Sequence, residues 1–252
     1  MPMVSAEDIV ATLLLDENAA QRQHLMRFFK TGKGDYGEGD EFIGLTAPQT
    51  RLVVKEAKGL VSLPEIEKLL YSRWHEARLA GFLLVVDEMS AALPKKRDGA
   101  NTLSAKAARR KELADFYLRH ARRANNWDLV DMTCPKILGY YLLYAADKDY
   151  SILYSLAGSD NLWEQRIAMV TNWMLIREGI FGPALDIAVK LLNHPHDLIH
   201  KAVGWMLREV GKRNKDLMLG FLEEHYSQMP RTALRYAIEQ LPEPERLSWL
   251  RR

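Results

Sequence analysis

The sequence predicts an all-α protein made of antiparallel helix pairs, and hydrophobic spacing, breaker positions and a loose internal repeat all favour this class. Apolar residues recur at helical spacing through most of the 252 residues, and no stretch alternates convincingly as a strand. Segments rich in Pro, Gly and Asn separate the predicted helices. They lie at 59–64, 94–101, 124–126, 134–135, 158–161, 193–195, 229–230 and 241–244.

The repeat is a basic residue that opens a largely apolar helical run, at Arg78, Arg166, Lys201 and Arg231. The last three lie about 30 to 35 residues apart, which is close to the period of solenoids built from helix pairs. The sequence therefore predicts a single α-solenoid domain over 1–252, with a concave face that one residue from each repeat would line. The recurring basic residues are candidates for following a polyanionic backbone along that face.

The N-terminal part contains recognisable helix starts. We expect a helix over 7–29 with Ser5 as its cap, and a second helix start at Thr46, where a capping hydroxyl is followed by Pro48. The glycine-rich segment 31–40 lacks the Gly-Lys-Ser/Thr ending of a phosphate-binding loop, so we interpret it as a connection.

The net charge of +2 is unevenly distributed, because 94–123 holds ten Lys and Arg against three acids. Such a local basic field indicates a polyanion at one face. The first fifteen residues do not resemble a secretory signal, and the longest apolar run, 137–146, is too short to cross a bilayer. One cysteine excludes an intrachain disulfide and fits a reducing cytoplasm.

The stretch Asn125–Asp131 combines an indole, two carboxylates and two amides. On a helix, Trp127 and Asp131 are four residues apart and share a face. An indole beside a carboxylate suits a cationic ligand, because both groups attract positive charge. The alternative is that Trp127 anchors the core and Asp131 is a surface charge or a helix cap.

Two later helices carry comparable pairs. In the predicted helix 197–212, Trp205 lies off the apolar stripe and shares a side with Lys201, Arg208 and Lys212, unless a neighbouring repeat covers it. In the helix after Asn161, Arg166 lies beside the apolar stripe. It either contacts a ligand, pairs with a carboxylate, or covers apolar surface with its stem.

No metal, cofactor or nucleophilic site is predicted. His196 and His200 have a four-residue spacing, but Pro195 and the missing glutamate spoil a zinc pattern, and a capping Asp197 explains the cluster. Cys134 precedes Pro135 with no local histidine partner, which makes a nucleophilic role a poor interpretation.

Four motifs together resemble the AlkD family of alkylpurine DNA glycosylases, the DNA alkylation repair enzymes, over nearly the whole chain from Phe28 onward. The family fold is a C-shaped superhelical array of HEAT-like helix pairs with a positively charged concave face. The basic segment at 94–111 departs from it by being longer than a tight repeat connection. The motifs are Asn126-Trp-Asp-Leu-Val-Asp131, Leu162-Trp-Glu-x-Arg166-Ile-Ala, Lys201-Ala-x-Gly-Trp205-Met-Leu-Arg208-Glu-Val-Gly-Lys212 and Met229-Pro-Arg231-Thr-x-Leu-Arg-Tyr-Ala-Ile-Glu239.

The resemblance implies hydrolysis of the N-glycosidic bond of N3- and N7-alkylated purines in duplex DNA. Asp131 would stabilise an oxocarbenium-like sugar and place water, Trp127 and Trp205 would contact the deoxyribose, and Arg166 would hold the backbone. An alkylated purine is already cationic and leaves without a general acid, so a carboxylate and indole faces suffice. Further expected DNA contacts are Lys201, Arg208, Lys212, Arg231, Thr46 and Arg51.

The expected partner is therefore alkylated duplex DNA, met by a monomer in the cytoplasm with the chromosome, without a membrane or an obligate protein partner. Two alternatives remain at this point. One is a non-catalytic HEAT-like protein that binds DNA through the same basic groove, and the other is a protein-interaction scaffold, a common use of helical solenoids.

Overall fold

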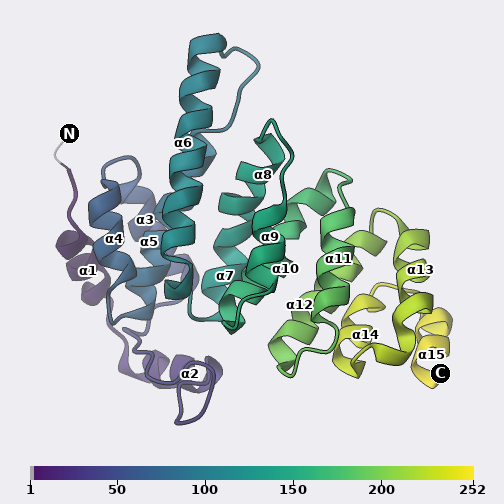
Figure 1. The fold of residues 1–252 in the computed structure, drawn as a ribbon. Coiled ribbons are helices and arrows are strands. Elements are labelled where there is room, and N and C mark those ends of the chain that lie inside the picture. The colour runs from purple at the N-terminus through teal and green to yellow at the C-terminus, as the bar shows by residue number, and fades with distance from the viewer. Residues whose placement is uncertain (1–2) are drawn as a thin grey trace. The chain divides into compact units, whose positions relative to one another are not determined.

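The computed structural model describes residues 3–252, and over that range the chain is helical apart from turns, loops and one isolated bridge between Glu41 and Trp74 (Figure 1). This confirms the all-α class. No helix in the described part is long and apolar enough to span a membrane. The chain divides into two compact units, of which unit 1 ends at Ile137 and unit 2 is Leu138–Arg252. One continuous solenoid through both units stays a prediction.

Unit 1 is organised around the helix α5, which packs against α3, α4, α6 and α7. Thirteen of the seventeen residues of α5 are buried, so the helix is covered on nearly every side and its first residues are held rigidly. The helices of this unit are α1 (Ala6–Leu15), α2 (Ala19–Phe28), α3 (Ala47–Ala57), α4 (Leu63–Leu70), α5 (His75–Ala91), α6 (Ala100–Arg119) and α7 (Trp127–Cys134).

The predicted single helix over 7–29 is wrong, because α1 and α2 are separate helices. Ser5 caps α1 as expected, with its hydroxyl accepting the Asp8 backbone N–H at 3.1 Å. Asn18 then starts a new helix, since its side-chain oxygen accepts the Gln21 N–H at 3.0 Å and its own N–H donates to the Ile43 carbonyl at 3.3 Å. A side chain that caps the backbone competes with helix continuation, and here it ends α1.

The segment between α2 and α3 is a loop, as predicted, and it packs closely on the start of α2. Gly44 has φ +106°, and a Cβ built there would lie 2.1 Å from the Asn18 carbonyl oxygen. Only glycine fits such a position. Thr46 caps α3 as predicted, and its hydroxyl donates to the Gln49 side chain at 2.7 Å in a capping box.

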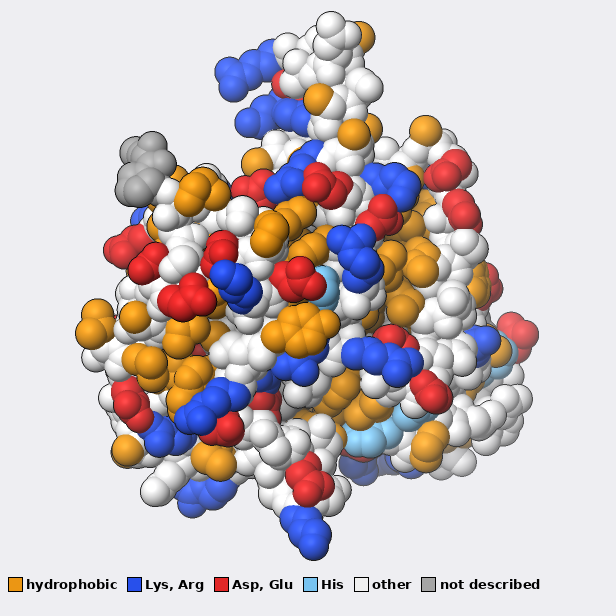
Figure 2. All heavy atoms as spheres, turned by 60° about the vertical axis from the view of Figure 1, so that its left-hand side comes forward, with side chains coloured by type: hydrophobic (Ala, Val, Ile, Leu, Met, Phe, Trp, Pro, Cys, Tyr) orange, Lys and Arg blue, Asp and Glu red, His pale blue; other side chains and the backbone are white. Residues whose placement is uncertain are grey.

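The basic segment 94–123 forms the loop before α6, α6 itself and the turn Ala121–Arg123. The first half of α6 stands out from the rest of unit 1 (Figure 1). Three of the segment's ten cations form ion pairs with nearby carboxylates, and Figure 2 shows basic and acidic side chains mixed over the face in view. The segment is therefore not one open basic surface, although Lys95, Lys96 and Arg97 are exposed in the loop. Ion pairs join Arg109 to Glu88 and Glu112, Lys106 to Asp98, and Lys111 to Asp115.

The predicted break at Cys134-Pro135 is also wrong. Pro135 has φ −63° and ψ −33°, and the chain continues through a π-helical turn, Pro135–Gly139, into α8. The ring fixes φ at a helical value and lacks only the N–H, so a wider turn accommodates it. The break comes later, after Tyr144.

Unit 2 is organised around α12, which packs against α10, α11, α13 and α14, while α10 packs against α9 and α11. Consecutive helices and next-but-one helices thus contact each other within this unit, as expected for stacked helix pairs. Its helices are α8 (Tyr140–Tyr144), α9 (Ser151–Ala157), α10 (Leu162–Arg177), α11 (Gly182–Leu191), α12 (Asp197–Gly211), α13 (Lys215–His225), α14 (Arg231–Ala237) and α15 (Glu243–Arg251).

The recurring basic residues do lie near the starts of α5, α10, α12 and α14, but they are not a uniform ligand row. Arg78 and Arg166 are 2% and 5% exposed. Arg78 donates to the Ser72 and Arg73 carbonyls at 3.0 Å, Arg166 to the Leu198 carbonyl, and Arg231 to the Leu250 carbonyl at 2.8 Å. Three of the four therefore donate to backbone carbonyls of neighbouring segments, which is a structural reason for the repeat.

Candidate functional site

The start of α7 is fixed to the loop that follows α2. Asn126 is fully buried and caps the helix, with its side-chain oxygen accepting the Trp127 N–H at 2.9 Å. Its amide nitrogen donates to the Phe29 carbonyl at 3.4 Å. A Cβ on Gly37 would lie 2.5 Å from that same carbonyl oxygen, so the loop backbone packs directly on the cap. The helix therefore begins at a defined place.

Trp127 is neither a core anchor nor a fully exposed ring. It is half-buried, with Phe29 stacked on its indole at 5.2 Å and Phe28 meeting it edge-on at 5.7 Å. Phe28 itself is 54% exposed. The three rings form an aromatic surface that is partly open to solvent, and this differs from the interpretation of Trp127 as a simple packing residue.

Asp131 lies one turn after Trp127 on α7 and is likewise half-buried. Its carboxylate is near enough to Tyr117 to influence that phenol: burial raises the pKa of Tyr117 well above its usual range, and Cys134 and Asp131 act in the same direction. The predicted pairing of an indole and a carboxylate on one side of one helix is thus present in the structure.

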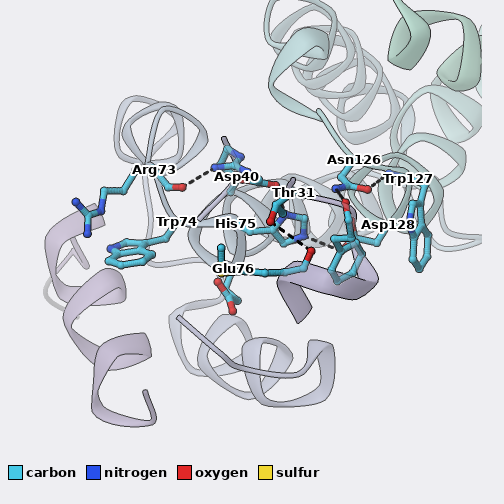
Figure 3. Close-up of polar contacts among 12 residues, drawn as sticks. Thr31, Asp40, Arg73, Trp74, His75, Glu76, Asn126, Trp127 and Asp128 are labelled. Carbon is cyan, nitrogen blue, oxygen red and sulfur yellow. Dashed lines mark hydrogen bonds and ion pairs between the residues drawn. The ribbon is translucent and has the colours of Figure 1, made fainter. Parts of the chain in front are cut away.

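A buried ion network lies behind this helix and was not predicted (Figure 3). The two ring nitrogens of His75, the first residue of α5, lie 2.8 Å from Asp40 and 2.8 Å from Asp128. Arg78 pairs with the other oxygen of Asp40. Burial lowers the pKa of His75, but Asp128 and Asp40 outweigh it and raise the value to about 9. The imidazole is therefore protonated at neutral pH.

Thr46 and Arg51, the expected DNA contacts of unit 1, occupy different environments. The Thr46 hydroxyl is used by the cap of α3, which leaves it little capacity for a phosphate. Arg51 is exposed on α3, and its guanidinium lies 3.4 Å from the sulfur of Met132, the residue after Asp131. Arg51 is therefore a neighbour of α7, whereas the role of Thr46 in the structure is to cap α3.

In unit 2, Trp205 is half-buried on α12, as expected for a residue off the apolar stripe. The next helix pair approaches closely beside it, because a Cβ on Gly204 would lie 2.4 Å from the Ala233 carbonyl oxygen and 2.5 Å from Tyr236 Cβ. Arg166 is buried and joins α10 to α12 through the Leu198 carbonyl. Its structural role is thus visible in the fold.

The expected DNA-binding cations of α12 are all engaged with carboxylates within unit 2. Lys201 pairs with Asp197 at 2.9 Å, Arg208 with Glu239, and Lys212 with Glu209 at 2.6 Å. Any phosphate that they bind must compete with these carboxylates. The carboxylates of Asp197 and Glu239 are exposed, so exchanging them for phosphate costs little. Glu209 is buried, and separating Lys212 from it is more costly.

The histidine cluster is a helix start. His196, not Asp197 as predicted, caps α12 by accepting the Leu198 N–H at 3.1 Å. His200 contacts the His194 carbonyl and His194 contacts Gln165. Among residues 3–252 no group of three His, Cys, Asp or Glu side chains is placed to hold a metal ion. Cys134 is buried.

A family model relates this chain to DNA alkylation repair enzymes, and a solved structure shares its fold. The model of the DNA alkylation repair enzyme family matches residues 9–241, so this chain belongs to that family. A solved structure, a predicted DNA alkylation repair enzyme from Enterococcus faecalis, is similar in fold, with a TM-score of 0.64 at 18% identity over 90% of this chain and 97% of that one. No curated protein sequence matches the chain.

Proposed function

We propose that this protein is a DNA glycosylase that hydrolyses the N-glycosidic bond of N3- and N7-alkylated purines in duplex DNA. In this proposal Asp131 stabilises the cationic sugar and positions the attacking water, while the indole of Trp127 contacts the deoxyribose. Family membership supports DNA alkylation repair as the setting, and the geometry of α7 supports the reaction.

The observation that carries the proposal is the pairing of Trp127 with Asp131 along one turn of α7. Both are half-buried and Trp127 is held by Phe29, so an indole and a carboxylate lie in fixed places at a partly open surface. Side chains held by packing need little reorganisation when charge develops on a ligand. A core role would instead require Trp127 to be fully enclosed.

The chemistry needs few protein groups. When the bond between C1′ and the alkylated purine nitrogen breaks, the electron pair goes to the purine, which becomes neutral, and the sugar takes up the positive charge. A carboxylate and indole faces stabilise that cation. Water then adds to C1′ and releases its proton to solvent or to the carboxylate. No separate general acid is required for a leaving group that is already cationic.

Unit 2 contains further residues with proposed contacts to DNA. Trp205 is half-buried and is assigned an indole contact with deoxyribose. Lys201, Arg208 and Lys212 are assigned to phosphates, which would displace Asp197, Glu239 and Glu209 from them. Arg166 is assigned to the DNA backbone, although its buried guanidinium already donates to the Leu198 carbonyl, and Arg231, exposed at the start of α14, is assigned to a flanking phosphate.

The test is to count free 3-methyladenine and 7-methylguanine released by the protein from methylated duplex DNA, with and without EDTA. We expect release that continues in EDTA, because a cationic purine leaves without a Lewis acid. Duplex binding without release would show a non-catalytic DNA-binding protein instead. Weak DNA association that does not change with salt would show a protein-interaction scaffold.

A further inference from the structure

His75 joins three segments of unit 1 that are distant in the sequence. It is 2% exposed and begins α5, its Nδ1 lies 2.8 Å from Asp40 in the loop, and its Nε2 lies 2.8 Å from Asp128 on α7. Figure 3 shows the imidazole between the two carboxylates, with Trp127 beyond Asp128. The residue next to it, Glu76, accepts the N–H groups of Ile43, Gly44 and Leu45 at 2.8–3.1 Å.

Both contacts of His75 are hydrogen bonds only when the ring carries two protons. An ionised carboxylate has no hydrogen to donate, and a neutral imidazole has one N–H, so it can satisfy only one of Asp40 and Asp128. Asp128 depends on this contact, because its other oxygen is buried without a hydrogen-bond partner. The loss of one imidazole proton would therefore place a ring lone pair against a carboxylate oxygen.

A continuous series of aromatic contacts connects His75 to the indole of Trp127. His75 stacks on Phe42 at 4.4 Å and lies 5.1 Å from Phe29, and Phe29 in turn stacks on the indole at 5.2 Å. The ring order from core to surface is thus Phe42 and His75, then Phe29, then Trp127. An imidazolium beside aromatic faces is also favourable, because the faces attract positive charge.

We propose that His75, in its doubly protonated form, is the positioning residue that fixes the rotation of α7, and thereby holds Trp127 and Asp131 toward the substrate. The inference rests on the proposed function for what the two residues do, but the positioning itself is a property of the free protein. Asp128 is the inward-facing residue of the turn that presents Trp127 and Asp131 outward, so its bond to His75 sets the angle of that turn.

The charged groups that face His75 make the charge balance of this network depend on the protonation state of His75. Asp40 is bonded to Arg78, and Arg123 interacts with both of them from the turn before α7. Asp128 faces His75 from α7. Glu76 is occupied by backbone N–H groups of the loop. With His75 protonated the two carboxylates have one cation between them, and its deprotonation leaves Asp128 uncompensated.

The experiment follows Trp127 in the DNA-free protein. In protein labelled with ¹⁵N at the indoles, the Trp127 signal is assigned by its loss in Trp127→Phe, and the ring signals of His75 are followed in the same samples from pH 7 to 10. We expect both to titrate together with a midpoint of about 9. In Asp128→Asn the midpoint should fall, because one carboxylate that holds the proton is gone. Asp87→Asn, which alters an exposed ion pair with Lys58, is the matched control and should leave it unchanged.

The pH dependence of the purine excision rate is the second measurement. If His75 positions α7, the single-turnover rate on methylated duplex DNA should follow the same curve and be about fourfold lower at pH 9.5 than at pH 8, which is the drop in the protonated fraction of a group with a pKa of about 9.

A Trp127 signal that does not move while His75 titrates overturns the positioning role. A midpoint that persists in Asp128→Asn also overturns it. Coupled titration without release of any base leaves the positioning role standing and removes only the proposed reaction. Should Asp128→Asn fail to fold, the shared midpoint in the unaltered protein still decides.

Discussion

At the scale of single residues, the half-buried state of Trp127 separates a ligand contact from a core anchor. Trp127→Ala removes a half-buried indole that contacts Phe28 and Phe29, so we expect a loss of about 1–2 kcal/mol in the free energy of unfolding. Trp163, which is 6% exposed, is the matched core residue, and Trp163→Ala should lose about 3–5 kcal/mol.

The same Trp127→Ala protein should remain folded and excise more slowly, because the sugar loses an aromatic face. Denaturant unfolding and single-turnover excision on one preparation measure both effects. Equal destabilisation by the two substitutions, with normal excision by Trp127→Ala, would return Trp127 to the core.

The buried imidazolium predicts a specific dependence of stability on pH. The folded-state pKa of His75 is about 9, above its value of 6.5 in the unfolded chain, so the folded state binds one more proton between these values. Its contribution is complete below pH 6.5, decreases by about 1.4 kcal/mol per pH unit above it, and is lost above pH 9. Urea unfolding between pH 7 and 9 measures the slope. It should become shallower in Asp128→Asn, and an unchanged slope in that variant would exclude His75 as its source.

Local spacing was enough to predict Trp127 and Asp131 as a pair, because four residues along a helix always bring two side chains together. The residues that support them were not predicted. His75 lies 53 positions before Asp128, and Phe29 lies 97 positions before Asn126, with nothing in the sequence between them to indicate contact. The adjacent Phe28 and Phe29 before a glycine-rich loop were the one local signal for the aromatic surface.

At the scale of elements, the most constrained contact in unit 2 is the crossing of α12 and α14 at Gly204. Gly204→Ala places a methyl group 2.4 Å from a backbone oxygen, which cannot move aside as a flexible side chain can. We expect a loss of about 1–3 kcal/mol in unfolding free energy. Gly220→Ala in α13, where no atom lies within 4 Å, should instead gain up to about 1 kcal/mol from helix propensity. Thermal unfolding of the two variants measures the contrast, and similar melting temperatures would contradict the packing.

Helix positions followed from hydrophobic spacing, while some boundaries depended on tertiary contacts. The break between α1 and α2 is made by Asn18, whose backbone N–H bonds to Ile43, and a single-sequence pattern contains no trace of that bond. Pro135 was predicted to end a helix, but it occupies a π-helical turn because its φ angle is already helical.

At the scale of the whole molecule, charge governs how the protein meets its proposed ligand. Duplex binding should weaken with salt along a line in log–log coordinates, with a slope of about −0.9 for each phosphate that a protein cation neutralises, because that phosphate releases its counterion. Lys201→Ala should make the slope shallower by about one. Lys215→Ala removes an exposed cation of α13 that pairs with Glu245 and has no proposed DNA contact, so its slope should match the unaltered protein. Fluorescence anisotropy over a salt series measures both, and a flat series would exclude a basic DNA-binding surface.

The most direct test of the proposed mechanism is the single-turnover rate of purine excision by Asp131→Asn on alkylated duplex DNA. If Asp131 stabilises the cationic sugar, the rate should fall by about 10²-fold or more, which is a few kcal/mol of transition-state stabilisation. DNA affinity should be equal or higher, because a carboxylate that repels phosphates is gone. Asp87→Asn should excise at the normal rate. An Asp131→Asn protein that excises as fast as the unaltered one would contradict the mechanism.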